Sequence, residues 1–161
     1  PWRSGAERMK KVGKTLVVGQ SGGPTAVINS SLAGVVQEAM LHEEIEGIYG
    51  LVHGIEGALK EELVDLRKES ADVLQGLQRT PASALGSCRH KLTEEDYERI
   101  LEVFEAHDVG FFVYVGGNDS MDTCYQVESL AHEKGLGMQV MGVPKTIDND
   151  LVGTVNLEII K

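Results

Sequence analysis

The sequence predicts an α/β fold in which a doubly wound, mainly parallel sheet is covered by helices on both faces. Short apolar segments of strand length alternate with longer segments of helical period. The apolar run Phe111–Val115 is unbroken, which is typical of a strand buried on both faces of a parallel sheet. Glycine pairs follow two of the predicted strands, at Gly22–Gly23 and Gly116–Gly117, where strand-to-helix turns are expected.

The first half of the chain begins with a strand and a long helix. Thr15–Gly19 is predicted to be a short buried strand that ends at the first glycine pair. Thr25–Glu43 is predicted to be a helix, because apolar residues recur along one side of it. The following segments are, in chain order, a strand at Glu46–Leu51, a glycine-punctuated stretch to Ala58, an apolar segment at Leu63–Leu66, and a short helix from a Ser70 cap to Leu77.

The second half continues the alternation after a polar loop at Thr80–His90. Thr93 offers an N-cap hydroxyl and acidic residues follow it, so a helix is predicted to start there. Its predicted buried side consists of Ile100, Leu101, Val103 and Phe104. The last elements are the strand Phe111–Val115, a helix that runs to about Lys134, and a strand at Gln139–Val143.

Composition limits the classes of protein that fit. The chain has 161 residues, enough for one domain with a core, and no apolar stretch approaches the ~20 residues of a membrane span. A formal net charge of -10 argues against nucleic-acid binding, which needs a basic surface. Two cysteines, Cys88 and Cys124, are too few for a disulfide scaffold and suit a reducing, cytoplasmic compartment. We therefore expect a cytoplasmic protein with neither a membrane nor a nucleic acid as partner.

Residues 1–13 differ in character from the rest of the chain. They are basic, and the opening Pro-Trp-Arg-Ser-Gly does not resemble an element of the fold. A nucleic-acid arm and a frayed extension both fit this pattern, and the second is favoured. We expect residues 1–13 to be a poorly ordered extension and residues 14–161 to form the α/β domain.

Three loops suited to phosphates follow predicted strands: Gly22–Gly23, Gly116–Ser120 and Pro144–Asp150. Carboxyl ends of parallel strands share one edge of the sheet, so these loops converge there if their strands are neighbours. Glycines let the backbone approach a phosphate, and a following helix N-terminus attracts negative charge. The last loop, Pro144-Lys145-Thr146-Ile147-Asp148-Asn149-Asp150, adds a cation, a hydroxyl and carboxylates, the groups that phosphoryl transfer needs.

Each of these motifs also has a purely structural explanation. Gly22–Gly23 fits an ordinary tight turn, and Asp119 and Ser120 fit a helix cap. Arg89 fits a solvated surface arginine, while Asp148 and Asp150 fit caps or surface charges. Clustering after buried strands favours a functional site for the last loop, whereas the alternatives for the other motifs stay open.

Four motifs in this order resemble the N-terminal half of 6-phosphofructokinases. They are Gly-Gly-Pro at 22–24, Leu-Gly-Ser-Cys-Arg at 85–89, Gly-Gly-Asn-Asp-Ser at 116–120 and Pro-Lys-Thr-Ile-Asp-Asn-Asp at 144–150. The resemblance covers about residues 14 to 151. Asp119 and Lys145 resemble the pyrophosphate-dependent branch, because ATP-using relatives usually have glycine at both positions.

The resemblance implies transfer of a phosphoryl group from pyrophosphate to the 1-hydroxyl of fructose 6-phosphate, a glycolytic reaction. It implies that Asp148 is the catalytic base and that Lys145 and Asp119 belong to the catalytic group. It places fructose 6-phosphate on Thr146, Ile147, Asp148 and Asp150. It places pyrophosphate on Gly22, Gly23, Arg89, Gly117 and Ser120. The implied cofactor is Mg²⁺, held by Asn118 and Asp119.

Two departures from the family pattern limit these implications. Asn118 stands where relatives usually carry an aspartate, and an amide oxygen is a weaker magnesium ligand. The chain is also much shorter than family members, which are expected to be homo-oligomers. We therefore expect an N-terminal fragment with little or no turnover alone. The alternatives are an ATP-dependent 6-phosphofructokinase, a related kinase of another substrate, and a non-catalytic fragment for phosphate binding or assembly.

Overall fold

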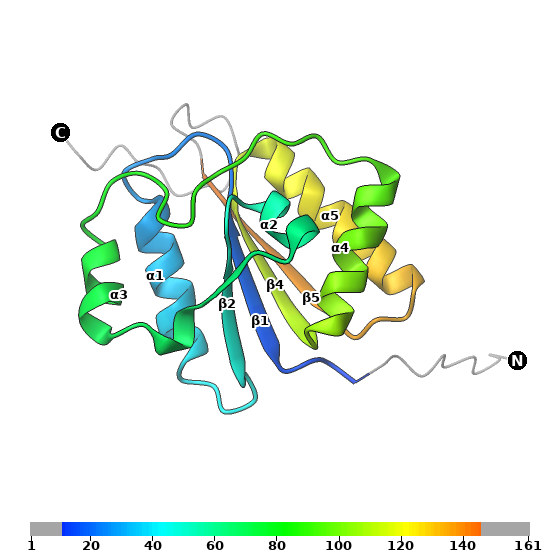
Figure 1. The fold of residues 1–161 in the computed structure, drawn as a ribbon, viewed down its shortest axis with the longest axis horizontal. Coiled ribbons are helices and arrows are strands. Elements are labelled where there is room, and N and C mark those ends of the chain that lie inside the picture. Colours follow the sequence, from blue (N-terminus) through cyan, green and yellow to red (C-terminus); the bar gives the residue numbers. More distant parts are fainter. Residues whose placement is uncertain (1–10, 146–161) are drawn as a thin grey trace, which may run out of the picture.

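A five-stranded sheet with the strand order β3-β2-β1-β4-β5 forms the centre of the molecule (Figure 1). The computed structural model describes residues 11–145. The strands are β1 (Thr15–Gln20), β2 (Gly47–Leu51), β3 (Leu63–Asp65), β4 (Val109–Gly116) and β5 (Gln139–Pro144). Neighbouring strands are parallel except for β2 and β3, so the predicted mainly parallel sheet is confirmed.

The edge strand β3 runs antiparallel to β2, with Tyr49 opposite Asp65. The sequence marked Leu63–Leu66 as apolar without assigning it a structure. A parallel return needs a crossover of about a dozen residues or more, and the connection here consists mainly of a six-residue helix. The short connection therefore brings the chain back in the opposite direction.

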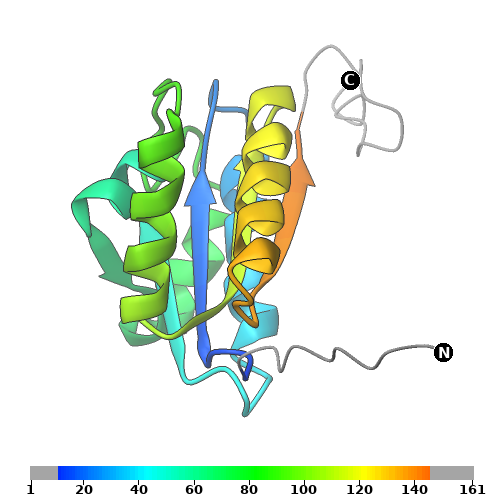
Figure 2. The ribbon, with the colours of Figure 1, turned by 90° about the vertical axis from the view of Figure 1, so that its right-hand side faces the viewer.

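Helices cover both faces of the sheet, as the doubly wound prediction requires. Figures 1 and 2 show α1 and α3 on one face, and α2, α4 and α5 on the other. Their bounds are α1 (Ile28–Ala39), α2 (Ile55–Lys60), α3 (Ala71–Leu77), α4 (Glu94–Ala106) and α5 (Asn118–Glu133), with a 3-10 turn at Leu66–Lys68. Among residues 11–145, no helix combines the length and apolar character needed to cross a membrane.

The strand order explains why α1 and α5 lie on opposite faces. The connection from β1 to β2 and that from β4 to β5 lead away from the centre of the sheet in opposite directions. Since both crossovers are expected to be right-handed, their helices must pack on opposite faces. The strand order reverses between β1 and β4, and ligands of such sheets bind beyond the carboxyl ends at this point.

Alternating residues of the strands supply two apolar layers. Val17 and Phe112 face α4 and α5, whereas Val18 and Val115 face α1. All six residues of β1 are buried, which confirms the prediction of a short buried strand at Thr15–Gly19. Each large apolar side chain buried in this way contributes about 1.5–3 kcal/mol to folding.

Local signals placed α3 and α4 correctly. The Ser70 hydroxyl caps α3 by accepting a hydrogen bond from the backbone N–H of Val73. Thr93 and Asp96 form a capping box, in which each side chain accepts from the other residue's backbone N–H, at 3.3 and 2.8 Å. These bonds lower the pKa of Asp96, with the Thr93 backbone as the largest cause.

Two helix predictions were inaccurate. The helix predicted at Thr25–Glu43 is shorter at both ends, because a turn follows Pro24 and helical structure begins only at Ile28. The stretch up to Ala58 contains α2, which the sequence did not predict. That helix lies between Gly54 at φ 62° and Glu61 at φ 58°. A short helix with an internal glycine has too little periodicity to be recognised.

Candidate functional site

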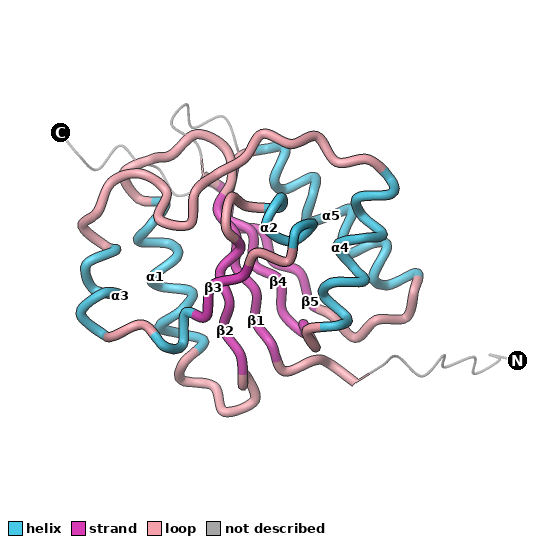
Figure 3. Tube along the Cα trace, viewed as in Figure 1, coloured by secondary structure: helices cyan, strands magenta, loops and turns pink. Residues whose placement is uncertain are grey.

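Three loops leave the carboxyl edge of the sheet from the neighbouring strands β1, β4 and β5. Gln20 at the end of β1 lies opposite Val115, and Gly116 at the end of β4 lies opposite Pro144. The backbone hydrogen bonds between β1 and β4 continue into the first loop, where the Ser21 N–H donates to the Val115 carbonyl oxygen at 2.8 Å. The predicted convergence of the three loops is therefore confirmed for residues 11–145. Figure 3 shows the loops that follow β1 and β4 at this edge.

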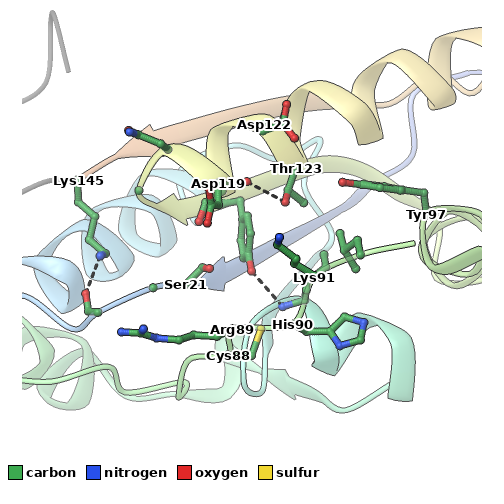
Figure 4. Close-up of a pocket in the computed structure, with 18 residues that line it drawn as sticks. Ser21, Cys88, Arg89, His90, Lys91, Tyr97, Asp119, Asp122, Thr123 and Lys145 are labelled. Carbon is green, nitrogen blue, oxygen red and sulfur yellow. Dashed lines mark hydrogen bonds between the residues drawn. The ribbon is translucent and has the colours of Figure 1, made fainter. Parts of the chain in front are cut away.

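A cavity of about 810 Å³ opens between these loops, and we call it the carboxyl-edge cavity (Figure 4). Every predicted site residue within the described part of the chain lines it. These residues are Gly22, Gly23, Arg89, Gly117, Asn118, Asp119, Ser120 and Lys145. Thr146, Ile147, Asp148 and Asp150 lie outside the described residues.

The two positions of the first glycine pair differ in why a glycine suits them. Gly22 has a φ of 74°, a left-handed conformation that favours glycine. A Cβ on Gly23 would meet no atom of residues 11–145 within 4 Å, so packing within this part of the chain does not require a glycine there. Gly23 therefore leaves open backbone at the wall of the cavity, which a phosphate could approach closely.

The second loop leads directly into the sixteen-residue helix α5. Gly117 is its N-cap residue, and no side chain caps it, so Asp119 and Ser120 are not the caps considered from the sequence. The first backbone N–H groups of a helix lack partners within the helix and carry partial positive charge. Since Gly117 and Asn118 line the cavity, this end of α5 can take an anion.

Asp119 and Ser120 lie in the first turn of α5 in different surroundings. Asp119 is exposed at the cavity, whereas Ser120 is 4% exposed. A Cβ on Gly116 would come within 2.0 Å of the Ser120 hydroxyl oxygen, so Ser120 requires the glycine before the helix. Ser120 thus helps to fix the second loop, while Asp119 presents its carboxylate to the cavity.

Lys145 connects the third loop to the other two. Its ammonium Nζ donates to the Gly23 carbonyl oxygen at 2.5 Å (Figure 4). Its backbone N–H donates to the Gly116 carbonyl oxygen at 2.9 Å. Partial burial lowers the pKa of Lys145 below its usual value by disfavouring the charged form. The cation therefore stands where the three loops meet.

Arg89 belongs to a segment without helix or strand that forms another wall of the cavity. Among residues 11–145 its guanidinium makes no ion pair, and it reaches the cavity together with the neighbouring Lys91. His90 instead lies 3.1 Å from the Asp96 carboxylate. An arginine without a partner can bind phosphate oxygens in a bidentate manner.

Several lining residues were not recognised from the sequence, including Ser21, Tyr97 and Tyr114. The Tyr114 hydroxyl accepts a hydrogen bond from the Ile55 backbone N–H at 3.2 Å, and burial raises the pKa of Tyr114. Tyr114 lies within β4, where the sequence shows only an apolar run. Tyr114 precedes Gly116 by two residues, and residues two apart in a strand face the same side of the sheet. This spacing was the available signal that Tyr114 lies near the second glycine loop.

The described residues offer few ligands for a metal ion. No group of three or more histidine, cysteine, aspartate or glutamate side chains within residues 11–145 could hold one. Asn118 and Asp119 supply an amide oxygen and a carboxylate at the cavity. Mg²⁺ commonly binds through one or two carboxylates and completes its shell with water and substrate phosphates. The residues therefore fit a magnesium ion that arrives with a phosphate ligand.

The fold and the cavity define an α/β protein whose glycine loops flank a cavity at the topological switch point of the sheet. The sequence profile of the phosphofructokinase family matches residues 15–156. The chain belongs to the phosphofructokinase family. Phosphotransferases of this family generally need a divalent metal.

Several relatives that are about half identical to this chain are named for pyrophosphate as donor. A pyrophosphate--fructose 6-phosphate 1-phosphotransferase of Methylococcus capsulatus is 49% identical over 138 residues, 82% of this chain and 33% of the relative. The crystal structure of a pyrophosphate-dependent phosphofructokinase from Marinobacter aquaeolei is 51% identical with a TM-score of 0.81, over 86% of this chain and 35% of that one. An ATP-dependent 6-phosphofructokinase of Amycolatopsis methanolica is 30% identical, over 81% of this chain and 28% of the relative. This chain thus spans a minor part of the length of each relative.

Proposed function

We propose that the complete enzyme transfers a phosphoryl group from pyrophosphate to the 1-hydroxyl of fructose 6-phosphate. The observation that carries this proposal is the position of Lys145, which bonds to both glycine loops through Gly23 and Gly116. A cation held at that junction suits a small donor with a high charge density. The higher identity to relatives named for pyrophosphate than to the ATP-dependent relative supports the same donor.

The carboxyl-edge cavity can hold the two phosphoryl groups of pyrophosphate. Gly23 and Gly117 leave room for oxygen atoms. Among residues 11–145, an added Cβ at Gly23 would meet no atom within 4 Å, and one at Gly117 would meet only the Lys145 carbonyl oxygen, at 3.9 Å. The N-terminus of α5 supplies backbone N–H groups, and Arg89 supplies a guanidinium. This acidic chain thereby concentrates positive potential at one place on its surface.

Asp119 gives the cavity its selectivity in this proposal. Its carboxylate lies beside the N-terminus of α5, where the additional phosphate of a nucleotide would bring a second negative charge. Like charges in a partly desolvated cavity repel strongly, so a carboxylate here disfavours ATP more than it disfavours pyrophosphate.

Residues that follow Lys145 in the sequence would serve the sugar. Asp148 takes the proton of the 1-hydroxyl, while Thr146, Ile147 and Asp150 bind fructose 6-phosphate. The sugar oxygen forms a bond to the nearer phosphorus atom, the bridging P–O bond breaks, and orthophosphate leaves with that electron pair. Lys145 and Arg89 stabilise the negative charge that develops on the phosphate oxygens.

A bound Mg²⁺ would neutralise further phosphate charge, with Asn118 and Asp119 as its protein ligands. We also propose that the enzyme is cytoplasmic and a homo-oligomer, and that residues 14–161 belong to its donor-binding domain, with residues 1–13 as an extension.

Steady-state kinetics of the complete enzyme test the proposal. The rate of fructose 1,6-bisphosphate formation is measured with pyrophosphate and, separately, with ATP as donor. Turnover with pyrophosphate supports the proposal, and a preference for ATP overturns the roles of Asp119 and Lys145. Calorimetry with pyrophosphate on the 161-residue chain separates binding from assembly, since undetectable binding at millimolar ligand would favour a purely structural fragment.

A further inference from the structure

Two buried amide side chains, Gln20 and Asn29, connect the first glycine loop to the segment that carries Arg89. Gln20 is the last residue of β1 and directly precedes Ser21, while Asn29 lies in the first turn of α1. They are 0% and 1% exposed, and neither lines the carboxyl-edge cavity. We propose that they are positioning residues that set the place of Arg89 relative to Gly22 and Gly23. This inference rests on the proposed use of that cavity for a phosphoryl donor.

The Gln20 amide is satisfied on both of its atoms. Its Nε2 donates to the Ile28 carbonyl oxygen at 3.1 Å and to the Asn29 side-chain oxygen at 3.0 Å. Its Oε1 accepts from the Leu85 backbone N–H at 3.0 Å and lies 2.9 Å from the Ser83 hydroxyl. A backbone carbonyl can only accept and a backbone N–H can only donate, so these partners fix the orientation of the amide.

Asn29 holds the same loop at two further points. Its Oδ1 accepts from the Ala84 backbone N–H at 2.9 Å, and its Nδ2 donates to the Thr80 carbonyl oxygen at 2.9 Å. The two side chains together therefore bond to three backbone groups, at Thr80, Ala84 and Leu85, of a loop that is neither helix nor strand. Because the pair is buried, a lost bond would not be replaced by water, which makes this loop position strongly preferred.

The loop stays anchored from these bonds up to Arg89. The Leu85 carbonyl oxygen accepts from the His53 backbone N–H at 2.7 Å. Gly86 follows with a φ of 76°, and a Cβ there would come within 2.4 Å of the His53 ring. Ser87 then donates its hydroxyl hydrogen to the Gly22 carbonyl oxygen at 2.6 Å. The segment is thus tied to the glycine pair two residues before Arg89.

The bonds form a closed path through both walls of the cavity. It runs from Gln20 at the end of β1 to Leu85, along the segment to Ser87, and back to Gly22 in the loop that follows β1. A shift of the segment must therefore change the separation of Arg89 from the glycine pair. Displacements of about 1 Å in a positioning group can lower catalysis by about 100-fold.

Isosteric variants of the complete enzyme test the role of the pair. Gln20→Glu keeps the size of the side chain but removes the donor to Ile28 and Asn29. Asn29→Asp likewise removes the donor to Thr80. Each should raise the KM for pyrophosphate about tenfold, while the KM for fructose 6-phosphate changes less than about twofold. An equal rise in both KM values would contradict a specific effect on the donor.

Gln78→Glu is the matched control. Gln78 donates its side-chain N–H to the side-chain oxygen of Gln37 in α1 at 3.2 Å. The same chemical change therefore removes a hydrogen bond between two amide side chains at an exposed site. It should leave both KM values unchanged. If the buried variants fail to fold, Ser83→Ala is the milder substitution, and it should shift the KM for pyrophosphate in the same direction.

A double-mutant cycle with Arg89→Ala decides whether the pair acts through Arg89. If it does, adding Asn29→Asp to the Arg89→Ala variant should lower kcat/KM for pyrophosphate by less than about a further twofold. Fully additive losses, which a general loss of stability would give, overturn the inference. Absence of pyrophosphate turnover in the unsubstituted enzyme would instead refute the proposed function, and the cycle is then measured with the donor that the enzyme uses.

Discussion

The two glycine pairs at the carboxyl edge, Gly22–Gly23 and Gly116–Gly117, follow neighbouring strands but differ in what comes next. After Gly22–Gly23 the chain passes through a turn, and α1 begins only at Ile28. After Gly116–Gly117 the helix α5 begins at once. Similar sequence motifs at adjacent strand ends therefore give two unlike walls of one cavity.

The difference indicates a division of tasks between the loops. The first loop offers open backbone at Gly23, whose carbonyl oxygen already bonds to Lys145. The second loop offers the N-terminus of a helix together with the carboxylate of Asp119. We infer that the first loop and Lys145 bind the small, highly charged donor, whereas the second loop disfavours ATP through Asp119.

Lys145→Met should have the largest effect, because it removes the cation that bonds to Gly23 at the cavity. We expect kcat with pyrophosphate to fall about 10²–10³-fold, the usual cost of losing one group that stabilises transition-state charge. Lys134→Met is the control, since Lys134 pairs with Glu98 at 3.3 Å and does not line the cavity. A change in KM without a change in kcat would assign Lys145 to binding alone.

Asp119→Gly should change the choice of donor. Without the carboxylate, the ratio of kcat/KM for ATP to that for pyrophosphate should rise about tenfold or more. Asp119→Asn keeps the volume and removes the charge, so it separates repulsion from steric exclusion. If the ratio of kcat/KM for the two donors is unchanged in both variants, the second loop does not determine the choice of donor.

Gly22→Ala and Gly23→Ala should separate conformation from ligand approach within the first loop. Gly22 has a positive φ, so alanine there should lower the free energy of unfolding by about 1–2 kcal/mol. Gly23→Ala meets no protein atom and should leave stability unchanged while it raises the KM for pyrophosphate. Urea unfolding and steady-state kinetics measure the two effects. Equal losses of stability would show that packing, not a ligand, requires Gly23.

The pH dependence gives the smallest expected effect. Burial places the pKa of Lys145 below the ordinary value of 10.5, so activity with pyrophosphate should begin to fall on the alkaline side below pH 10.5. Lys145→Arg keeps its charge to higher pH and should move this fall upward. An alkaline fall at the same pH in both proteins would assign it to another group.

The lowered pKa of Lys145 also determines the direction in which stability should change with pH. Since the pKa is lower in the folded state than in the unfolded state, the unfolded chain binds more protons between the two values. The Lys145 contribution to the free energy of unfolding should therefore rise with pH in that window. Lys145→Met should lack this rise.

Features set by local sequence were predicted well. Thr93 and Asp96 define the start of α4 within four residues, and the two glycine pairs mark the ends of β1 and β4. The convergence of the loops followed from the parallel sheet alone. The predicted site residues within 11–145 accordingly lie around one cavity.

Features that depend on distant contacts could not be predicted. Lys145 and Gly23 are 122 residues apart, and no sequence pattern indicates that their atoms bond. No local sequence pattern marks Gln20 and Asn29, because the loop backbone that they bond to lies more than fifty residues away. Tyr97 and Tyr114 also line the cavity, and their positions there likewise depend on how distant parts of the chain pack together.

The central claim is that the two glycine loops form a site for pyrophosphate rather than ATP. Its most direct test is the kcat/KM of the complete enzyme with each donor at saturating fructose 6-phosphate. The account predicts that pyrophosphate supports turnover and that its kcat/KM exceeds that of ATP by about 100-fold or more. An equal or higher kcat/KM with ATP would contradict it.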